Sequence, residues 1–243
     1  LVLALMQPFL RANAEVAEYK PLLIDCSASM SAIDEATGKT RLELVKEKGI
    51  TVVHVVSSSK FARKAEEAGC DAVVAEGFEA GGHNGREETT SLVLLPAVKK
   101  AVTIPVIAAG GIATGRQMLA CMVLGAEGVQ MGSRFVASVE ASSHIQFKNE
   151  VIRAQEGDTQ LMMKQLTPVR LLKNEFFTQV QEAEKKCASV DELEKLLGRG
   201  RAKRGMFEGN LEEGELEIGQ VSAIIKNIKP AAEIVYEMYK EYE

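Results

Sequence analysis

Paired cysteines, long apolar segments and clustered positive charge are all scarce in this chain of 243 residues. Its four cysteines, Cys26, Cys70, Cys121 and Cys187, lie far apart without the spacing of a metal site, which predicts isolated thiols in a reducing compartment. No apolar run is long enough to cross a membrane, and the opening segment LVLALMQPFL lacks a basic leader and a cleavage site. We therefore expect a cytoplasmic protein without membrane contact.

The charge balance argues against nucleic acid as a partner. The formal net charge is −5, the isoelectric point is near 5.5, and basic and aromatic residues form no common pattern. One basic cluster, GRGRAKRG at Gly198–Gly205, is interpreted as a solvated loop, with a local anion contact as the alternative. Because the chain begins at Leu1 rather than methionine, we expect its natural start to lie further upstream.

The middle of the chain alternates between short apolar strands and helical segments. At 46% hydrophobic residues, the chain can form one sizeable core, or one domain with an appendage. Four apolar runs, each followed by a helical pattern, are predicted to be strands: Ile50–Val56, Asp71–Gly77, Ile104–Gly111 and Gly128–Phe135. Strands that are apolar on both sides and separated by helices favour parallel βα units. Such units close into a (β/α) barrel or form an open doubly wound sheet.

The two ends of the chain differ from this middle part. We divide the sequence into a strand-helix segment at 1–48, βα units at 49–140, and a helical cap with C-terminal helices at 141–243. The first segment contains a predicted strand at Leu22–Ile24 and a helix from about Thr40. The last contains amphipathic helical stretches separated by charged loops rich in glycine and glutamate.

Two consecutive predicted strands end in glycine loops, at Ala109-Gly110-Gly111 and Met131-Gly132-Ser133. Without a Cβ the backbone can approach a phosphate closely, and the following helix adds its positive end. In barrel enzymes the loops after the last two strands form a common phosphate site. The two loops therefore indicate a phosphorylated cofactor or substrate.

A third glycine-rich loop, EGFEAGGHNG, carries His83. An imidazole with a pKa near 6.5 can abstract a proton at neutral pH, and the neighbouring glycines allow a ligand to lie against the backbone. A solvent-exposed loop histidine is the alternative. His54, inside a predicted strand, is interpreted as a core or barrel-lining residue, and His144 as the start of a helix.

Four ordered motifs, AEGFEAGGHNG, IPVIAAGGIATGRQ, LGAEGVQMGSRF and EIGQVSA, resemble the nitronate monooxygenase (2-nitropropane dioxygenase) family from about residue 49 to the end. The flavin-dependent enoyl-acyl-carrier-protein reductases are close relatives of that family. The resemblance implies an FMN-binding TIM barrel with a helical excursion beside the cofactor. It makes His83 the candidate general base. It also implies contacts with FMN from Glu76, Gly77, Gly81, Gly82, Gly110, Gly111, Gly132, Ser133, Gly219 and Gln220.

The activity implied by the resemblance is FMN-dependent oxidation of nitronates or nitroalkanes by O2, giving a carbonyl compound and nitrite. An enoyl reductase, which passes hydride from a nicotinamide through FMN to an enoyl thioester, is the first alternative. That reaction needs no GxGxxG motif, so the absence of one does not separate the two. The second alternative is a chimeric or truncated half-barrel without activity.

The chain also departs from the family. Family members begin with four further βα units, so the strands from Ile50 would be barrel strands five to eight, and a homodimer of two half-barrels would restore closure. Residues 15–48 instead resemble the start of a von Willebrand factor A domain. There Asp25, Ser27 and Ser29 would form part of a Mg²⁺ site, but the other ligands of that site do not follow, so we predict no metal.

Overall fold

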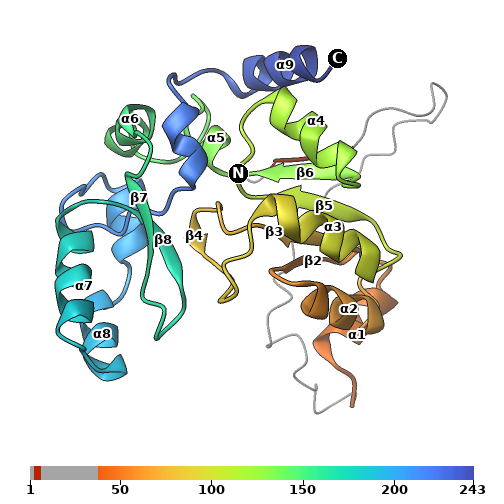
Figure 1. The fold of residues 1–243 in the computed structure, drawn as a ribbon, viewed down its shortest axis with the longest axis horizontal. Coiled ribbons are helices and arrows are strands. Elements are labelled where there is room, and N and C mark those ends of the chain that lie inside the picture. The colour runs from red at the N-terminus through yellow and green to blue at the C-terminus, as the bar shows by residue number, and fades with distance from the viewer. Residues whose placement is uncertain (1–2, 7–37) are drawn as a thin grey trace.

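The computed structural model describes residues 3–6 and 38–243, which form a sheet covered by helices and, beside it, a smaller lobe (Figure 1). The predicted strand at 22–24 and the Asp25, Ser27 and Ser29 triplet lie outside the described residues. The main sheet has five strands in the order β1-β6-β5-β3-β2. Their bounds are Leu3–Met6 for β1, Val53–Val56 for β2, Ala72–Glu76 for β3, Val106–Ala109 for β5 and Gly128–Met131 for β6.

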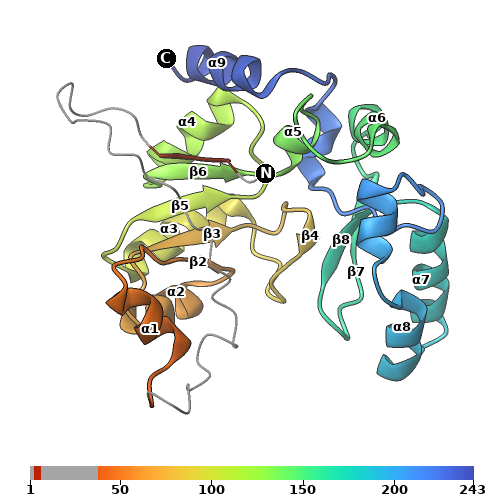
Figure 2. The ribbon, with the colours of Figure 1, turned by 180° about the vertical axis from the view of Figure 1, so that it is seen from behind.

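Strands β2, β3, β5 and β6 are parallel to one another, whereas β1 pairs antiparallel with β6. Helices α2 (Ser59–Glu67), α3 (Ser91–Ala101) and α4 (Gly115–Val123) connect the parallel strands, as Figure 2 shows from behind. The predicted βα units are therefore confirmed. Local capping defines the helix starts, because Ser58 accepts a hydrogen bond from the Phe61 N–H and Thr114 forms a capping box with Gln117.

The strands are apolar on both faces because both faces are covered. Val73 and Ala75 of β3 pack with Leu94, Leu95 and Val98 of α3 in the main core. On the other face, Val74, Ile107 and Ala109 form a small cluster. Alternate residues of a strand point to opposite sides, so Glu76, two residues after Val74, lies on the same face as this cluster.

The C-terminal helix α9 (Ala231–Tyr242) returns to the main sheet and packs on α4 (Figure 1). The close approach depends on Gly115, because a Cβ there would lie 2.0 Å from the Met238 carbonyl oxygen. Glu241 accepts a hydrogen bond of 2.8 Å from the Gly115 N–H and so caps the start of α4. The last helix thus belongs to the helical layer of the main sheet. The domain boundaries at residues 48 and 140 stay predictions.

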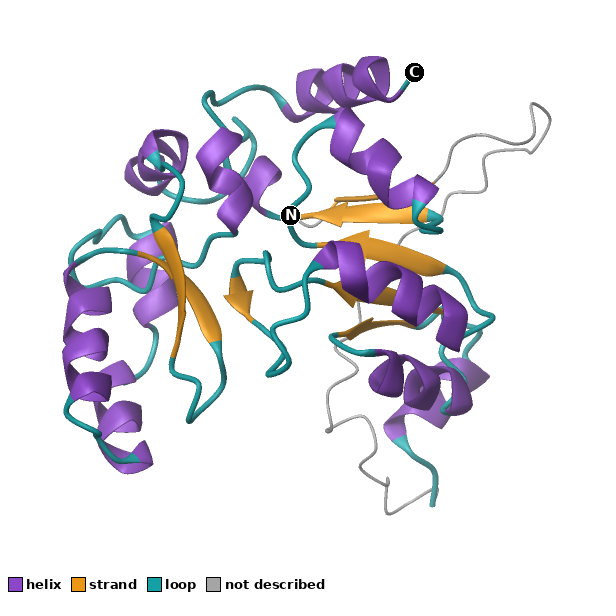
Figure 3. Ribbon diagram, viewed as in Figure 1, coloured by secondary structure: helices purple, strands orange, loops and turns teal. Residues whose placement is uncertain are grey.

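The smaller lobe contains a second, antiparallel sheet that the sequence did not predict (Figure 3). It consists of β4 (Gly82–His83), β8 (Val169–Leu172) and β7 (Thr159–Met162). The expectation of a purely helical cap was wrong, because each of these strands is too short to produce a clear two-residue alternation in the sequence. Around the sheet lie α6 (Ile145–Arg153), α7 (Glu175–Lys185), α8 (Val190–Leu197), the π-helix η2 (Lys203–Phe207) and the 3₁₀-helix η3 (Gln220–Ile224).

Two short helices complete the described elements, α1 (Arg41–Glu47) and α5 (Ser133–Val136). The helix expected from about Thr40 is confirmed by α1, where Thr40 forms a capping box with Glu43. His144 is the N-cap of α6, as expected of a helix start. Among the described residues, Cys70 and Cys121 are buried and Cys187 is exposed, and none of these three is in a disulfide.

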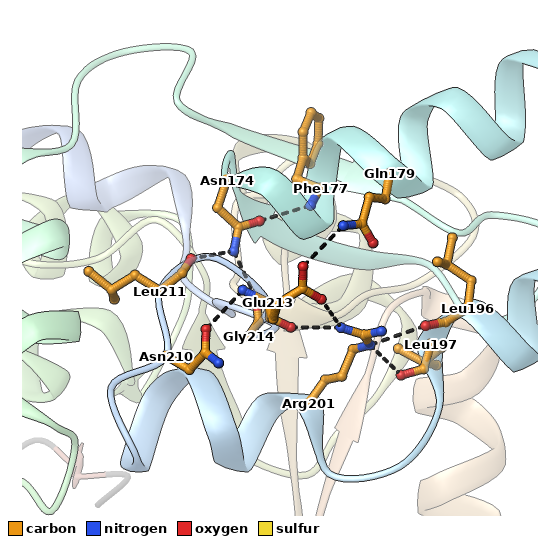
Figure 4. Close-up of polar contacts among 10 residues, drawn as sticks. All are labelled: Asn174, Phe177, Gln179, Leu196, Leu197, Arg201, Asn210, Leu211, Glu213 and Gly214. Carbon is orange, nitrogen blue, oxygen red and sulfur yellow. Dashed lines mark hydrogen bonds and ion pairs between the residues drawn. The ribbon is translucent and has the colours of Figure 1, made fainter.

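A polar network joins the helices of the smaller lobe to the segment that leads back toward the main sheet (Figure 4). Arg201 donates hydrogen bonds to the carbonyl oxygens of Leu196, Leu197 and Glu213 and pairs with the Glu213 carboxylate at 3.1 Å. Asn174 caps α7 and donates to the carbonyls of Leu211 and Gly214. The interpretation of the basic cluster as a solvated loop is therefore wrong for Arg201, whose guanidinium is held inside this network.

None of the helices in the described parts of the chain has the length and apolar character needed to span a membrane.

Candidate functional site

A cleft of about 230 Å³ opens at the carboxyl ends of β3, β5 and β6, where parallel α/β proteins present their binding loops. Strand-end residues form its floor, and the glycine loops, α5, η2 and the segment before η3 form its walls. The lining residues are Glu76, Glu79, Ala80, Gly81, Ala109, Gly110, Gly111, Ile112, Gln130, Met131, Gly132, Ser133, Val136, Met206, Glu217, Ile218 and Val221.

Strand β8 of the smaller lobe brings the histidine-bearing loop and the C-terminal segment together. Gly82 pairs with Arg170, and Glu217 forms a bridge to Leu171, the next residue along β8. Gly82 and Glu217 are therefore neighbours on one edge of the strand. A Cβ on Gly82, whose φ is +75°, would lie 2.6 Å from Glu217 Oε2, so glycine is required there.

The first glycine pair of the cleft is equally constrained. Gly110 and Gly111 have φ values of +87° and +74°, which place both in the left-handed region that favours glycine. A Cβ on Gly110 would lie 2.8 Å from the carbonyl oxygen of Gly77. A Cβ on Gly77 would in turn lie 2.1 Å from Ser91 Oγ. The loops after β3 and β5 thus touch through backbone.

The glycine that follows β6 leaves free space instead. A Cβ on Gly132 would meet no atom within 4 Å, although the residue lines the cleft. Within the described residues, the backbone N–H groups of Gly111 and Gly132 donate to no protein acceptor. Ser133 Oγ accepts a hydrogen bond of 3.0 Å from the Gly219 N–H. Two amides without an acceptor in the described part of the chain, on loops that line one cleft, form a cradle suited to a phosphate group.

Three carboxylates surround the cleft. Glu79 is held by the N–H of Ser91, at 3.0 and 3.1 Å from its two oxygens, and so caps the start of α3. Burial raises the pKa of Glu76 to about 7, and its carboxyl forms no hydrogen bond within the described residues. Burial also raises the pKa of Glu217, while the nearby charge of His83 lowers it. The cleft therefore holds one carboxyl group, that of Glu76, that can exchange protons near neutral pH.

Outside the cleft, Glu215 is 7% exposed, and burial and the charge of Glu217 raise its pKa to about 7. A raised pKa means that the folded chain binds more protons than the unfolded chain. The free energy of unfolding should therefore fall as the pH rises from 4.5 to about 7, by roughly 1–3 kcal/mol for such a group. Urea denaturation at pH 5 and pH 8 should show a smaller difference for Glu215→Gln than for the unchanged chain. An equal difference in both proteins would contradict this assignment.

The structure brings most of the predicted site residues together. Glu76, Gly81, Gly110, Gly111, Gly132 and Ser133 line the cleft, and Gly77, Gly82 and Gly219 pack directly behind its walls. His83 and Gln220 are exposed and lie outside the lining. His54 lies on β2 rather than near the cleft. The roles predicted for these residues stay predictions.

Sequence reasoning missed several residues of the cleft: Glu79, Gln130, Met206 and Glu217. Glu79 and Glu217 stand inside the motifs EGFEAGGHNG and EIGQVSA, so their place beside the glycines was an available signal. Gln130 is an isolated polar residue in the β6 strand pattern. Met206 lies on a π-helix that no sequence pattern announced.

Comparison with known proteins agrees with this geometry. A family model described as nitronate monooxygenase matches residues 13–241. A probable nitronate monooxygenase from Staphylococcus saprophyticus is 34% identical over 201 residues, covering 78% of this chain and 56% of that protein. The structure of FabK from Thermotoga maritima matches with a TM-score of 0.77 at 44% identity, covering 82% of this chain and 63% of that chain.

A third relative is the nitroalkane oxidase from Streptomyces ansochromogenes, whose structure matches with a TM-score of 0.68 at 29% identity and covers 83% of this chain and 60% of that chain. This chain thus spans between 56% and 63% of the length of the three relatives. Together with the parallel βα units, the two structural matches confirm an α/β fold of TIM-barrel type. That the chain is the second half of such a barrel stays a prediction.

The resemblance of residues 15–48 to a von Willebrand factor A domain finds no support, because the family match begins at residue 13 and includes that segment. The extent of the match and the order of the four motifs lead to one conclusion. The chain belongs to the nitronate monooxygenase family.

Proposed function

We propose that this chain carries the cofactor and substrate cleft of an FMN-dependent enzyme that oxidises nitronates or nitroalkanes with O2. The observation that supports this most strongly is the pair of cleft-lining loops at Gly111 and Gly132, whose backbone amides have no acceptor among the described residues. A phosphate needs such donors because the described residues that line the cleft include no lysine or arginine. The family of the chain and the name of its Streptomyces relative point to the same chemistry.

The residues present fit FMN in three respects. The amides of Gly111 and Gly132 would hold its phosphate, with Ser133 Oγ beside them. Glu76 of β3 and Gln130 of β6 both pair with Ala109 of β5, which lies between them. Their side chains would offer hydrogen bonds to the polar edge of the flavin ring. The apolar side chains of Ile112, Val136, Met206, Ile218 and Val221 would exclude water from the cleft. Bound FMN would supply the acceptor for the electrons of the substrate.

The protein's own contribution is to bind and orient the substrate and to move protons. A nitronate is an anion, and a nitroalkane becomes one by losing the proton on the carbon next to the nitro group. Among the described residues the lining has no basic side chain, so the cleft suits the small uncharged nitroalkane, which its carboxyl groups do not repel. These groups are able to accept a proton, because burial raises the pKa of two of them.

A flavin-dependent enoyl reductase is the second candidate, and the match to Thermotoga FabK is the observation that favours it. Nitronate oxidation and enoyl reduction differ in their substrate and electron donor, whereas both would use the same FMN site at Gly111 and Gly132. The predicted cytoplasmic location, homodimer and lack of a nucleic-acid partner accompany both candidates as predictions.

The test is direct. The chain, loaded with FMN, should consume O2 and release nitrite when given ethyl nitronate, and should not oxidise NADH in the presence of crotonyl thioester. Oxygen uptake and nitrite release measure the first activity, and NADH absorbance measures the second. NADH oxidation that depends on crotonyl thioester, without nitrite release from the nitronate, would show that the reductase is the correct assignment.

A further inference from the structure

His144 joins the start of α6 to the π-helix η2, which contributes to the wall of the cleft. Its backbone N–H donates a hydrogen bond of 2.7 Å to the carbonyl oxygen of Met206, the η2 residue that lines the cleft. Met206 also packs against the apolar cluster that contains Phe147 of α6, which is fully buried. The position of this part of the wall therefore depends on how α6 begins.

The imidazole of His144 is the N-cap of α6. Its Nδ1 accepts a hydrogen bond of 3.2 Å from the backbone N–H of Gln146. A ring nitrogen accepts a hydrogen bond only when it carries no proton, so this contact requires the neutral ring with its proton on Nε2. Histidine is also the residue whose charge ordinarily changes between pH 5 and 8. The cap of α6 is thus built on a group that titrates.

The same ring lies against the turn that follows η2. Gly209 in this turn has φ +80°, and a Cβ there would lie 2.3 Å from Nδ1 and 2.5 Å from Cε1 of His144. The backbone of the turn can approach the ring this closely because Gly209 has no side chain. A movement of the ring out of the cap would therefore remove a contact that η2 and its turn depend on.

From these contacts, and resting on the proposed function, we propose that His144 regulates the cleft: its neutral ring holds Met206 in the wall, and its protonation releases the wall and weakens FMN binding. A proton on Nδ1 replaces the acceptor with a donor that faces the N–H of Gln146. It also places a positive charge at the start of α6, where the helix dipole is already positive. His144 is a positioning residue, because it acts through Met206.

Other titratable groups lie on the elements packed around His144. They are Glu140 before α6, Lys148, Glu150 and Arg153 on α6, Lys203, Arg204 and Glu208 on η2 and its turn, and Glu212, Glu213, Glu215 and Glu217 on the segment 211–218 packed against η2. Glutamate, lysine and arginine ordinarily keep one charge between about pH 5.5 and about 7.5. Burial raises the pKa of Glu215 to about 7, and it also raises the pKa of Glu217 and of Glu76 in the same cleft. The experiment therefore has to separate His144 from these three carboxyl groups.

The experiment follows the Met206 methyl group and the His144 ring by NMR from pH 5 to pH 8, in the purified chain without FMN. At pH 8 the nitrogen-15 shifts of the ring should show the proton on Nε2. As the pH falls, the Met206 methyl resonance should shift with the same midpoint as the His144 ring. FMN titration at pH 7.5 and 5.5 then measures the effect on the ligand.

Two substitutions reproduce the two states of the ring. His144→Asn keeps an uncharged acceptor at the N-cap, so it should lose the Met206 step and bind FMN at pH 7.5 within about twofold of the unchanged chain. Between pH 7.5 and 5.5 the unchanged chain should lose about fivefold more FMN affinity than His144→Asn, as expected for the loss of one N-cap. His144→Ala has no acceptor and should bind FMN about fivefold more weakly already at pH 7.5.

Glu215→Gln is the control for the neighbouring carboxyl groups, because it removes a titration on the segment packed against η2. It should keep the Met206 step that follows the His144 ring. Glu217→Gln and Glu76→Gln should keep that step as well. Loss of the step in one of these variants, with His144 still titrating, would show that a carboxyl group controls the wall and would overturn the inference.

The remaining outcomes separate the inference from the proposed function. A Met206 methyl that does not follow the His144 ring, or that shifts equally in folded His144→Asn, would overturn the inference, as would a proton on Nδ1 at pH 8. Equal loss of FMN affinity at pH 5.5 in both proteins would also overturn it. Failure to bind FMN at either pH would count against the proposed function, and the Met206 titration would still decide the role of His144.

Discussion

Replacing Gly81 with alanine should destabilise the chain and weaken FMN binding together. A Cβ on Gly81 would lie 2.3 Å from the carbonyl carbon of Ile218 and 2.4 Å from the backbone nitrogen of Gly219. Both are backbone atoms of a segment fixed by hydrogen bonds, so no side chain can rotate away. We expect a loss of about 1–3 kcal/mol in the free energy of unfolding. Separation of the two walls of the cleft should lower FMN affinity by at least about tenfold.

Gly132→Ala is the control for this substitution. Gly132 has φ −99° and ψ −66°, which alanine adopts readily, and a Cβ there meets no atom within 4 Å. Its stability should therefore stay within about 0.5 kcal/mol of the unchanged chain. The added methyl group would enter the cleft, so FMN affinity should still fall. Urea denaturation and FMN titration of both variants measure the two effects. Equal stability of Gly81→Ala and Gly132→Ala would contradict the packing described here.

Arg170→Met should produce the second large effect. Arg170 is 1% exposed, and its Nη2 and Nε donate to the carbonyl oxygen of Phe78 at 2.8 and 3.2 Å. Its guanidinium also stacks on the Phe78 ring, 4.4 Å from the centroid. The substitution would leave the Phe78 carbonyl without its donor, at a cost of about 1–3 kcal/mol in the free energy of unfolding. It would also release the loop that carries Glu79 and Gly81 from the smaller lobe.

Arg170→Lys tests whether the geometry of the guanidinium matters. A lysine keeps the positive charge but cannot offer two parallel donors or stack as a plane, so it should destabilise at least as much as methionine. Arg116→Met, on the exposed side of α4, is the control and should change stability by no more than about 0.5 kcal/mol. Full stability of Arg170→Lys would show that charge alone holds the loop.

The sequence predicted the four parallel strands of the main sheet because their signals are local, but it did not predict β1. Apolar strands such as Val106–Ala109 and capped helices such as α4 are determined by short windows of residues. The glycines of the cleft were found for the same reason. What the sequence could not show depends on contacts distant along the chain. The pairing of Gly82 with Arg170 joins residues 88 positions apart, since 170 − 82 = 88.

The difference between His83 and Glu217 illustrates the same limit. A histidine among glycines attracts attention in a sequence, whereas one glutamate among many near residue 215 does not. The bridge of Glu217 to Leu171 of β8 brings this residue to the lining of the cleft, whereas His83 is exposed. Position in the fold, which the sequence does not show, decides which residues line the cleft.

Titration of the purified chain with FMN, followed by quenching of flavin fluorescence, tests the central claim most directly. If the amides of Gly111 and Gly132 form a phosphate cradle, the chain should bind FMN in a saturable manner. Inorganic phosphate should compete with it, and Gly132→Ala should bind more weakly while remaining folded. Fluorescence that does not change on adding the chain, or equal binding by Gly132→Ala, would contradict the account.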